Sequence, residues 1–345
     1  MNNNKMEGYV EWTSPSNIAT IKYWGKTEDQ HPLNPSLSFT LKNSKTITGI
    51  KYKRTRNKES SLKVIYDKTE NVAFEKRIQE YLHKIKNTLP NISYYDLEIN
   101  TRNTFPHSTG IASSASAFSA LALCLYSIEN KIMSEEDLHK VSNLARIGSG
   151  SASRSLYPNA ALWGKTNLLV ESSNIHAIDY TKYLHPIFKT LQNTILIIND
   201  EEKKVSSSQG HQIMSKNPFA TTRYNQANQN LEKIIPALQT GDFKTYSEIL
   251  ENEALTLHAL MMTSMPGYIL MKPNTLQSIE LINEFKHNTN LPVTYTMDAG
   301  PNIHIQYPKI YAKQIISFID LKLKPLCKNQ QIIYDEIGAG PERNV

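Results

Sequence analysis

Apolar and polar residues alternate over short stretches in the first third of the chain, which is the pattern of half-buried β-strands. Elsewhere, apolar residues recur three or four positions apart, which predicts amphipathic helices. We expect strands at residues 9–13, 19–23, 36–41, 46–52, 62–66, 95–100, 191–200, 293–298, 303–307 and 331–335. We expect helices at residues 71–87, from about 114 onward, and at 134–147, 220–238, 242–261, 275–288 and 310–321. Strands dominate the first part of the chain, and helices with further strands among them follow. This order predicts an α+β fold.

The length and one apolar run predict two domains. The chain has 345 residues, which suits two domains of ordinary size. The run LQNTILIIND at residues 191–200 reads as a buried strand that opens the second part, so we expect domains at 1–187 and 188–345. One helix start is also marked, because Ser134 and Asp137 are spaced as a capping box.

The segment NIATIKYWGK, at residues 17–26, raises a chemical question. If the segment were a strand, Lys22 would lie on the same face as the apolar residues Ile18 and Trp24. A lysine in that position needs a partner. The plain structural alternative is a strand-edge lysine whose aliphatic stem carries its ammonium group to water.

Composition narrows the classes of function. Hydrophobic residues make up 39% and charged residues 20%, which is typical of a soluble globular protein. The net charge of +6 suits a small polyanionic substrate. The basic run at 51–58 lacks an aromatic-basic module, so we expect no nucleic-acid partner. Cys124 and Cys327 form no metal-binding or redox motif. The serine-containing apolar run at 111–128 reads as a buried helix, so we expect a cytoplasmic protein without a membrane span.

Two stretches are suited to binding anions. Residues 105–123 place Gly110, Ser113 and Ser114 before an apolar helix, where free backbone N–H groups and the helix dipole attract phosphate. The GK[ST] of a Walker A loop is missing, and a helix with small residues for close packing is the alternative. Residues 146–157 form a hydroxyl-rich turn ending in Arg154, which suits a carboxylate or a phosphate unless this arginine is merely solvated.

Two more stretches carry polar side chains after apolar strands. The serines of VSSSQGH, at residues 205–211, offer hydroxyls to a phosphate, or the stretch forms a plain polar loop. Asp298 ends the apolar strand VTYTMD and needs a partner if it is buried. A nearby lysine would keep it ionised. The alternative is a β-turn in which Asp298 caps the following backbone.

Taken in order, these stretches resemble a known family. NIATIKYWGK, NPSLSFTL, GIASS, GSGSASRSLY, VSSSQG and DAGPN resemble segments of diphosphomevalonate decarboxylases, a branch of the GHMP kinase superfamily. The resemblance spans almost the whole chain, and KYWGK and DAGPN with the arginine loop are typical of the decarboxylase branch. It implies a two-domain α+β GHMP kinase fold, with a ribosomal-protein-like N-terminal ATP-binding domain, a ferredoxin-like C-terminal domain and the active site between them.

The resemblance also implies a reaction: ATP-dependent decarboxylation of (R)-5-diphosphomevalonate to isopentenyl diphosphate, with Mg²⁺ held mainly by ATP, no dedicated metal cage and a homodimer. Lys22 would pair with Asp298, which would orient the substrate's 3-hydroxyl or accept its proton, and Arg154 would bind the substrate carboxylate. The implied catalytic residues are Asp298, Lys22, Arg154 and Asn17; the substrate contacts are Tyr23, Lys26, Ser149, Ser151, Arg154 and Ser207; the ATP contacts are Gly110, Ala112, Ser113 and Ser114, with Ser114 the candidate Mg²⁺ ligand.

The chain departs from the family pattern at Pro158-Asn159, where the family usually has a Gly-Gly pair, at His107, where it usually has a small or hydroxyl residue, and at two further positions. His211 stands where the family usually has methionine, and Ser208 stands where some bacterial members have an arginine that reaches substrate phosphate. A phosphomevalonate decarboxylase, or a kinase that phosphorylates the 3-hydroxyl and stops, therefore stays open as an alternative. A non-catalytic basic binding protein is the more distant alternative, and Lys22, Arg154 and Asp298 in their expected contexts count against it.

Overall fold

The computed structural model describes residues 6–27, 29–55, 60–106, 111–200 and 207–345. Its strands are β1 (Glu7–Ala19), β2 (Ser36–Arg54), β3 (Leu62–Tyr66), β4 (Thr69–Glu70), β5 (Tyr95–Asn103), β6 (Ala160–Trp163), β7 (Ala177–Asp179), β8 (Leu191–Leu196), β9 (Thr294–Thr296), β10 (Ile303–Pro308), β11 (Ile332–Glu336) and β12 (Glu342–Arg343). Its helices are α1 (Val72–Ile85), α2 (Ser113–Glu129), α3 (Glu135–Gly148), α4 (Pro186–Lys189), α5 (Ser207–Met214), α6 (Ala220–Thr240), α7 (Phe243–Met262), α8 (Pro273–Thr289) and α9 (Ala312–Phe318).

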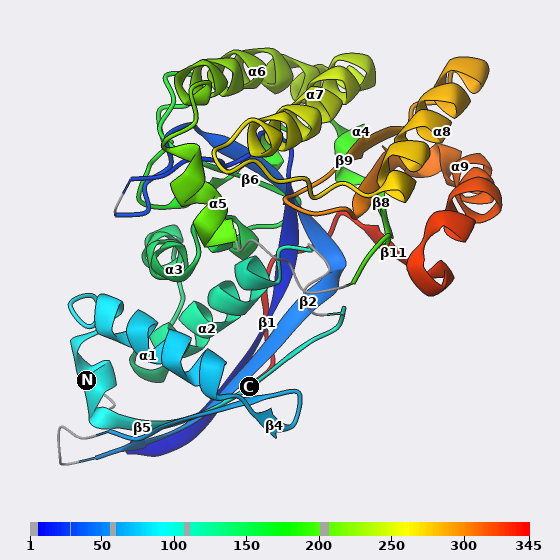
Figure 1. Cartoon of the computed structure of the whole chain (residues 1–345). Helices are drawn as coiled ribbons and strands as arrows, with labels where there is room; N and C mark the ends of the chain where they lie inside the picture. Colours follow the sequence, from blue (N-terminus) through cyan, green and yellow to red (C-terminus); the bar gives the residue numbers. More distant parts are fainter. Residues whose placement is uncertain (1–5, 28, 56–59, 107–110, 201–206) are drawn as a thin grey trace.

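The N-terminal domain is built on one large sheet. Its strands run in the order β12-β1-β2-β5-β3-β4, and the short strands β6 and β7 extend from β2. Helices α1, α2 and α3 lie on one side of this sheet (Figure 1). Helix α2 is apolar almost all round and nearly every residue after its first turn is buried, because it packs against the sheet and against α3. No helix in the described part of the chain is long and apolar enough to cross a membrane.

The C-terminal domain has a second, four-stranded antiparallel sheet in the order β11-β8-β10-β9. Helices α8 and α9 cover one face, where Leu196 of β8 joins a core with Ile282 and Ile315. On the other face Ile195 packs with α6, α7 and residues of β2. Strand β8 is therefore buried on both faces, which explains why Ile195, Leu196, Ile197 and Ile198, at its end and just after it, are apolar in succession rather than alternating with polar residues.

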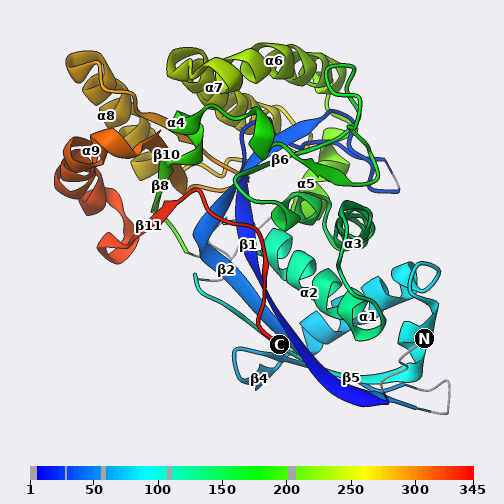
Figure 2. The same ribbon diagram turned by 180° about the vertical axis from the view of Figure 1, so that it is seen from behind.

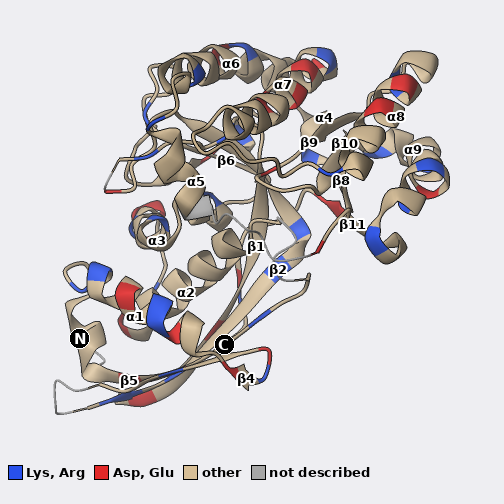
Figure 3. Cartoon of the chain, viewed as in Figure 1, with Lys and Arg blue, Asp and Glu red and all other residues tan. Residues whose placement is uncertain are grey.

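The C-terminal segment connects the two sheets. Figure 2 shows it passing from β11 along β2 to the edge of β1, where β12 pairs. Lysines and arginines are interspersed with acidic residues on α1, α6 and α7 (Figure 3), as on an ordinary solvated surface. The capping box predicted at the start of α3 is confirmed, since Ser134 and Asp137 exchange both hydrogen bonds.

Two separate strands predicted at 36–41 and 46–52 are wrong, because β2 runs unbroken through the polar residues between them. The carboxylate of Asp335 in β11 accepts hydrogen bonds from the backbone N–H groups of Lys42, Asn43 and Ser44, at 2.8–3.0 Å. A buried carboxylate from the other sheet thus keeps the polar stretch extended, a contact that the local pattern cannot indicate. Strand β1 is likewise longer than the predicted 9–13.

The strand predicted at 19–23 is also wrong, because β1 ends at Ala19 and residues 20–25 are irregular. The backbone of Lys22 makes its hydrogen bonds to side chains instead of a neighbouring strand. Its N–H donates to Glu253 Oε2 at 2.8 Å, and its carbonyl accepts from Asn34 Nδ2 at 3.1 Å. The helix predicted at 310–321 is correct only in its middle, since α9 is flanked by a 3₁₀ turn and a π-helical turn.

Candidate active site

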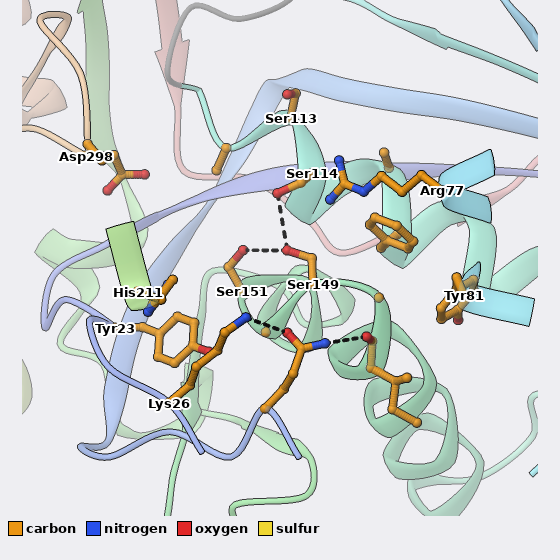
Figure 4. Close-up of a pocket in the computed structure, with 18 of the residues that line it drawn as sticks. Tyr23, Lys26, Arg77, Tyr81, Ser113, Ser114, Ser149, Ser151, His211 and Asp298 are labelled. Carbon is orange, nitrogen blue, oxygen red and sulfur yellow. Dashed lines mark hydrogen bonds between the residues drawn. The ribbon is translucent and has the colours of Figure 1, made fainter. Parts of the chain in front are cut away.

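A cavity of about 1620 Å³ is lined by residues of both domains. Figure 4 shows its polar lining, to which α2, α5, the turn after α3 and the loop after β9 contribute. The predicted site residues that line it are Asn17, Lys22, Tyr23, Lys26, Ala112, Ser113, Ser114, Ser149, Ser151, Arg154 and Asp298. Gly110 and the side chain of Ser207 lie outside the described part of the structure. Segments far apart in sequence therefore meet at one place.

Lys22 and Asp298 form an ion pair at this place. Lys22 Nζ lies 3.0 Å from Asp298 Oδ1, and the lysine side chain is 3% exposed while that of the aspartate is 27% exposed. Burial lowers the pKa of Lys22, and the charge of Asp298 opposes that shift. The carboxylate thus favours the charged lysine in a site that would otherwise favour the neutral amine.

Arg154 lies buried beside this pair, in the 3₁₀ turn Gly150–Leu156. Its Nε donates to Ser38 Oγ at 2.9 Å and its Nη2 to Asn17 Oδ1 at 3.3 Å. Its Nη1 is buried and has no partner among the described residues. Burial lowers the pKa of Arg154 to about 10, which still leaves the guanidinium charged at neutral pH. An unpaired buried donor on a cation indicates a place for an anion.

Tyr23 and His211 pack together on the wall of the cavity (Figure 4). The Tyr23 ring lies 4.8 Å from Trp163 and 4.5 Å from His211 between centroids, and its hydroxyl is buried without a partner among the described residues. His211 Nδ1 accepts from the backbone N–H of Gly25 at 3.0 Å, so the neutral ring carries its proton on Nε2. Burial lowers the pKa of His211 to about 3, which keeps the imidazole neutral near pH 7.

The start of α2 forms a second polar wall. Ala112 precedes the helix with a φ of +46°, no side chain caps the first turn, and that turn carries no acidic residue. Ser114 Oγ lies 3.2 Å from Ser149 Oγ, which lies 3.4 Å from Ser151 Oγ (Figure 4). Backbone donors at the positive end of a 17-residue helix, beside three hydroxyls, form a surface suited to phosphate.

Lys26 lies below Tyr23 in Figure 4, and its Nζ donates to Gln30 Oε1 at 3.1 Å. Burial is the main cause that lowers its pKa. Farther along the cavity, the Arg77 guanidinium lies 4.8 Å from the centre of the Phe118 ring, which Tyr81 contacts edge-on. This aromatic end of the cavity is suited to a planar group. No group of three or more His, Cys, Asp or Glu side chains among the described residues is placed to hold a metal ion.

Both halves of the chain match models of one protein family. Residues 14–175 match the diphosphomevalonate decarboxylase-like N-terminal domain, and residues 193–342 match the mevalonate 5-diphosphate decarboxylase C-terminal domain. The diphosphomevalonate decarboxylase of Ganoderma lucidum is 31% identical, over 95% of this chain and 85% of the relative. The chain belongs to the diphosphomevalonate decarboxylase family. The predicted α+β fold of the GHMP kinase type is thereby confirmed.

Solved structures of this family superpose on the whole chain. Mevalonate diphosphate decarboxylase from Staphylococcus aureus has a TM-score of 0.85 and 29% identity, with 99% of both chains covered. The enzyme from Enterococcus faecalis has a TM-score of 0.82 and 26% identity, over 97% of this chain and 98% of the other. A structure of MDDEF in complex with MVAPP, AMPPCP and magnesium has a TM-score of 0.83 and 27% identity, over 97% of this chain and 98% of the other.

Sequence reasoning missed several residues of this decarboxylase-family site. Ser38 and Ser155 hold Arg154 and Asn17, and Arg77 stacks on Phe118. Ser38 and Ser155 lie in the family-like stretches NPSLSFTL and GSGSASRSLY, but these stretches do not indicate which side chains they contact, and Arg77 lies in none of the stretches. His211 was singled out only as a departure from the family pattern, and its contacts with Tyr23 and Gly25 depend on the tertiary fold.

Proposed function

We propose that this chain catalyses the ATP-dependent decarboxylation of (R)-5-diphosphomevalonate to isopentenyl diphosphate, with release of ADP, phosphate and CO₂. The observation that carries the proposal is the buried Arg154 guanidinium, whose Nη1 has no partner among the described residues, beside the Lys22–Asp298 pair. A substrate carboxylate would satisfy that donor, and a hydroxyl close by would face Asp298. Membership of the family, whose named relatives carry this activity, supports the same reaction.

The start of α2 fits the phosphates of ATP. Its uncapped first turn, without acidic residues, leaves backbone donors available near the hydroxyls of Ser113 and Ser114. Mg²⁺ carried by the nucleotide would neutralise charge on the transferring phosphate, and Ser114 is the hydroxyl that we assign to it. The aromatic end of the cavity, at Arg77 and Phe118, is where the planar base would lie. The complex of MDDEF with AMPPCP and magnesium supports ATP and Mg²⁺ as the cofactors.

The chain's own residues then have distinct tasks. Asp298 orients the substrate's 3-hydroxyl or accepts its proton as the oxygen bonds to the γ-phosphorus of ATP and ADP leaves. Lys22 stabilises the negative charge that develops on the transferring phosphoryl group. Arg154, held by Asn17, keeps the carboxylate in place while it is still charged.

Phosphorylation turns the 3-hydroxyl into a good leaving group. The C3–O bond breaks with its electron pair going to phosphate, and positive charge builds up at C3. The electron pair of the bond between C2 and the carboxylate carbon then forms the C2=C3 double bond, and CO₂ leaves. Tyr23, Lys26, Ser149, Ser151 and Ser207 are the residues that we assign to the diphosphate at the far end of the substrate.

Incubation of the purified chain with (R)-5-diphosphomevalonate and Mg·ATP tests the proposal. We expect mass spectrometry to detect isopentenyl diphosphate, and to detect none when ATP is omitted. Formation of 3-phospho-5-diphosphomevalonate as the end product would leave a kinase and contradict the proposal. The proposed boundary near residue 188 rests on the apolar run at 191–200, and the proposed cytoplasmic location on the sequence. The homodimer rests on family resemblance alone, and sedimentation of the purified chain tests it.

A further inference from the structure

A fully buried ion pair lies outside the group of residues described above. Arg223 of α6 and Glu253 of α7 form a salt bridge in which the side chains are 1% and 0% exposed. Arg223 Nη1 donates to Glu253 Oε1 at 2.9 Å, and Asn230 Nδ2 donates to the same oxygen at 2.7 Å. Burying such a pair costs desolvation energy that its attraction often fails to offset, so stability alone is a weak reason for its presence.

Both members of the pair hold the backbone of Lys22. Glu253 Oε2 accepts from the Lys22 N–H at 2.8 Å, and Arg223 Nη2 donates to the Lys22 carbonyl at 3.3 Å. Asn34 Nδ2 donates to that carbonyl as well, at 3.1 Å. The peptide groups on both sides of Lys22 are therefore held by side chains, in a segment where no strand ladder fixes them.

These contacts cross between the two domains. Lys22 follows β1 of the N-terminal domain, whereas Glu253 and Arg223 lie on two helices of the C-terminal domain that pack against each other. Asp298, the partner of Lys22 Nζ, also belongs to the C-terminal domain. The ion pair and Asp298 thus hold one residue at both ends, its backbone and its ammonium group.

We propose that Glu253 and Arg223 are positioning residues, which fix the main chain of Lys22 so that its ammonium group meets Asp298 and the reacting phosphoryl group. The inference rests on the role proposed above for Lys22. Misplacement of a catalytic group by about 1 Å can lower a rate about 10²-fold, so a holding device of this kind affects turnover directly.

Glu253→Gln tests the inference with little change of shape. The two carboxylate oxygens accept from Lys22, Asn230 and both terminal nitrogens of Arg223. A glutamine offers one oxygen and one NH₂ group. The donors that faced the replaced oxygen, either Lys22 N–H and Arg223 Nη2 or Asn230 Nδ2 and Arg223 Nη1, therefore lose their acceptor. We expect kcat to fall about 10- to 100-fold, with KM for Mg·ATP unchanged, because the α2 wall is not touched.

Glu251→Gln is the matched control. Glu251 lies two residues away on the same helix and also takes part in a salt bridge, at 2.7 Å from Lys286 Nζ, but its carboxylate accepts hydrogen bonds from Lys286, Ser247 and Thr294 and not from Lys22. We expect it to lower thermal stability and to leave kcat at the wild-type value. If Glu251→Gln and Glu253→Gln lower kcat equally, the effect is a general loss of structure and the inference is overturned.

Asn230→Ala decides the matter if Glu253→Gln does not fold, because it removes a single hydrogen bond to Glu253. We expect a several-fold lower kcat and an unchanged KM for Mg·ATP; a wild-type kcat in that variant would overturn the inference. A wild-type chain without turnover would refute the proposed function itself. If the wild type turns over and Glu253→Gln has nearly the same kcat as the wild type, only the positioning role is refuted.

Discussion

Asp298→Asn removes the charge that faces Lys22 and leaves the shape of the site nearly unchanged. At the observed 3.0 Å, two unit charges attract by about 5.5 kcal/mol at an effective dielectric constant of about 20. The Asp298 side chain is 27% exposed, so water screens part of this attraction, and we take about half, or ~3 kcal/mol, as the loss. Loss of the Asp298 charge therefore lowers further the pKa of Lys22, which burial already lowers.

The sign of the pH dependence follows from the lowered pKa. A lysine whose pKa is lower in the folded state binds fewer protons there, so stability rises with pH between the folded pKa and the unfolded value of about 10.4. We therefore expect Asp298→Asn to be less stable than wild type by about 3 kcal/mol at neutral pH. The difference in stability between wild type and variant should shrink as the pH rises from the folded-state pKa of Lys22 in the variant to its higher folded-state pKa in the wild type. Urea unfolding at a series of pH values measures it.

The double variant Lys22→Met with Asp298→Asn is the control for this reasoning. It removes the ammonium group that Asp298→Asn leaves buried without its carboxylate partner, so most of the lost stability should return while activity stays absent. A double variant as unstable as Asp298→Asn would show that the unpaired lysine is not the cause. For turnover, Asp298→Asn should lose about 10³-fold or more in kcat. A variant that folds and keeps more than about a tenth of wild-type turnover removes Asp298 from the mechanism.

Two more substitution or titration results are expected. Arg154→Lys should raise KM for the organic substrate about tenfold or more and leave KM for Mg·ATP unchanged. The reason is that a lysine cannot reproduce the planar set of donors that the buried guanidinium presents. Equal KM values for the organic substrate in wild type and variant would contradict binding of a carboxylate at Arg154. His211, whose pKa is lowered to about 3, should give imidazole NMR signals of a neutral ring down to about pH 5, and an inflection near pH 6.5 would contradict its buried acceptor role.

The elements that the sequence predicts well carry their signals locally. The helices expected at 220–238 and 242–261 are α6 and α7, within two residues at each end. Their apolar spacing continues for about five turns, and Asp242 caps α7 as a side chain close in sequence. The start of α3 is equally local, because the capping box at Ser134 lies within four residues.

Two of the failures depend on side chains far away in the sequence. The polar middle of β2 stays extended because of Asp335, which is 291 residues from Ser44. The strand predicted at 19–23 gives way to an irregular segment held by Glu253, which is 231 residues from Lys22. Alternation of apolar residues cannot report such contacts, since a buried carboxylate satisfies backbone donors as well as a neighbouring strand does.

In the candidate site, too, some residues could be predicted from the sequence and others could not. Lys22, Arg154 and Asp298 stand in motifs that resemble a family, so their presence in one cavity could be expected from the sequence. Glu253 stands in no such motif, and NPSLSFTL, which contains Ser38, does not indicate the contact of Ser38 with Arg154. Their contribution became visible only when the fold placed them beside Arg154 and Lys22.

The most direct test of the central claim is to measure CO₂ and ADP released by the purified chain with Mg·ATP, comparing (R)-5-diphosphomevalonate with 5-phosphomevalonate. The account predicts turnover of the diphosphate with one CO₂ for each ADP. Preference for the monophosphate would contradict the substrate that we assign and would point to a phosphomevalonate decarboxylase. Release of ADP without CO₂ would contradict the decarboxylation itself.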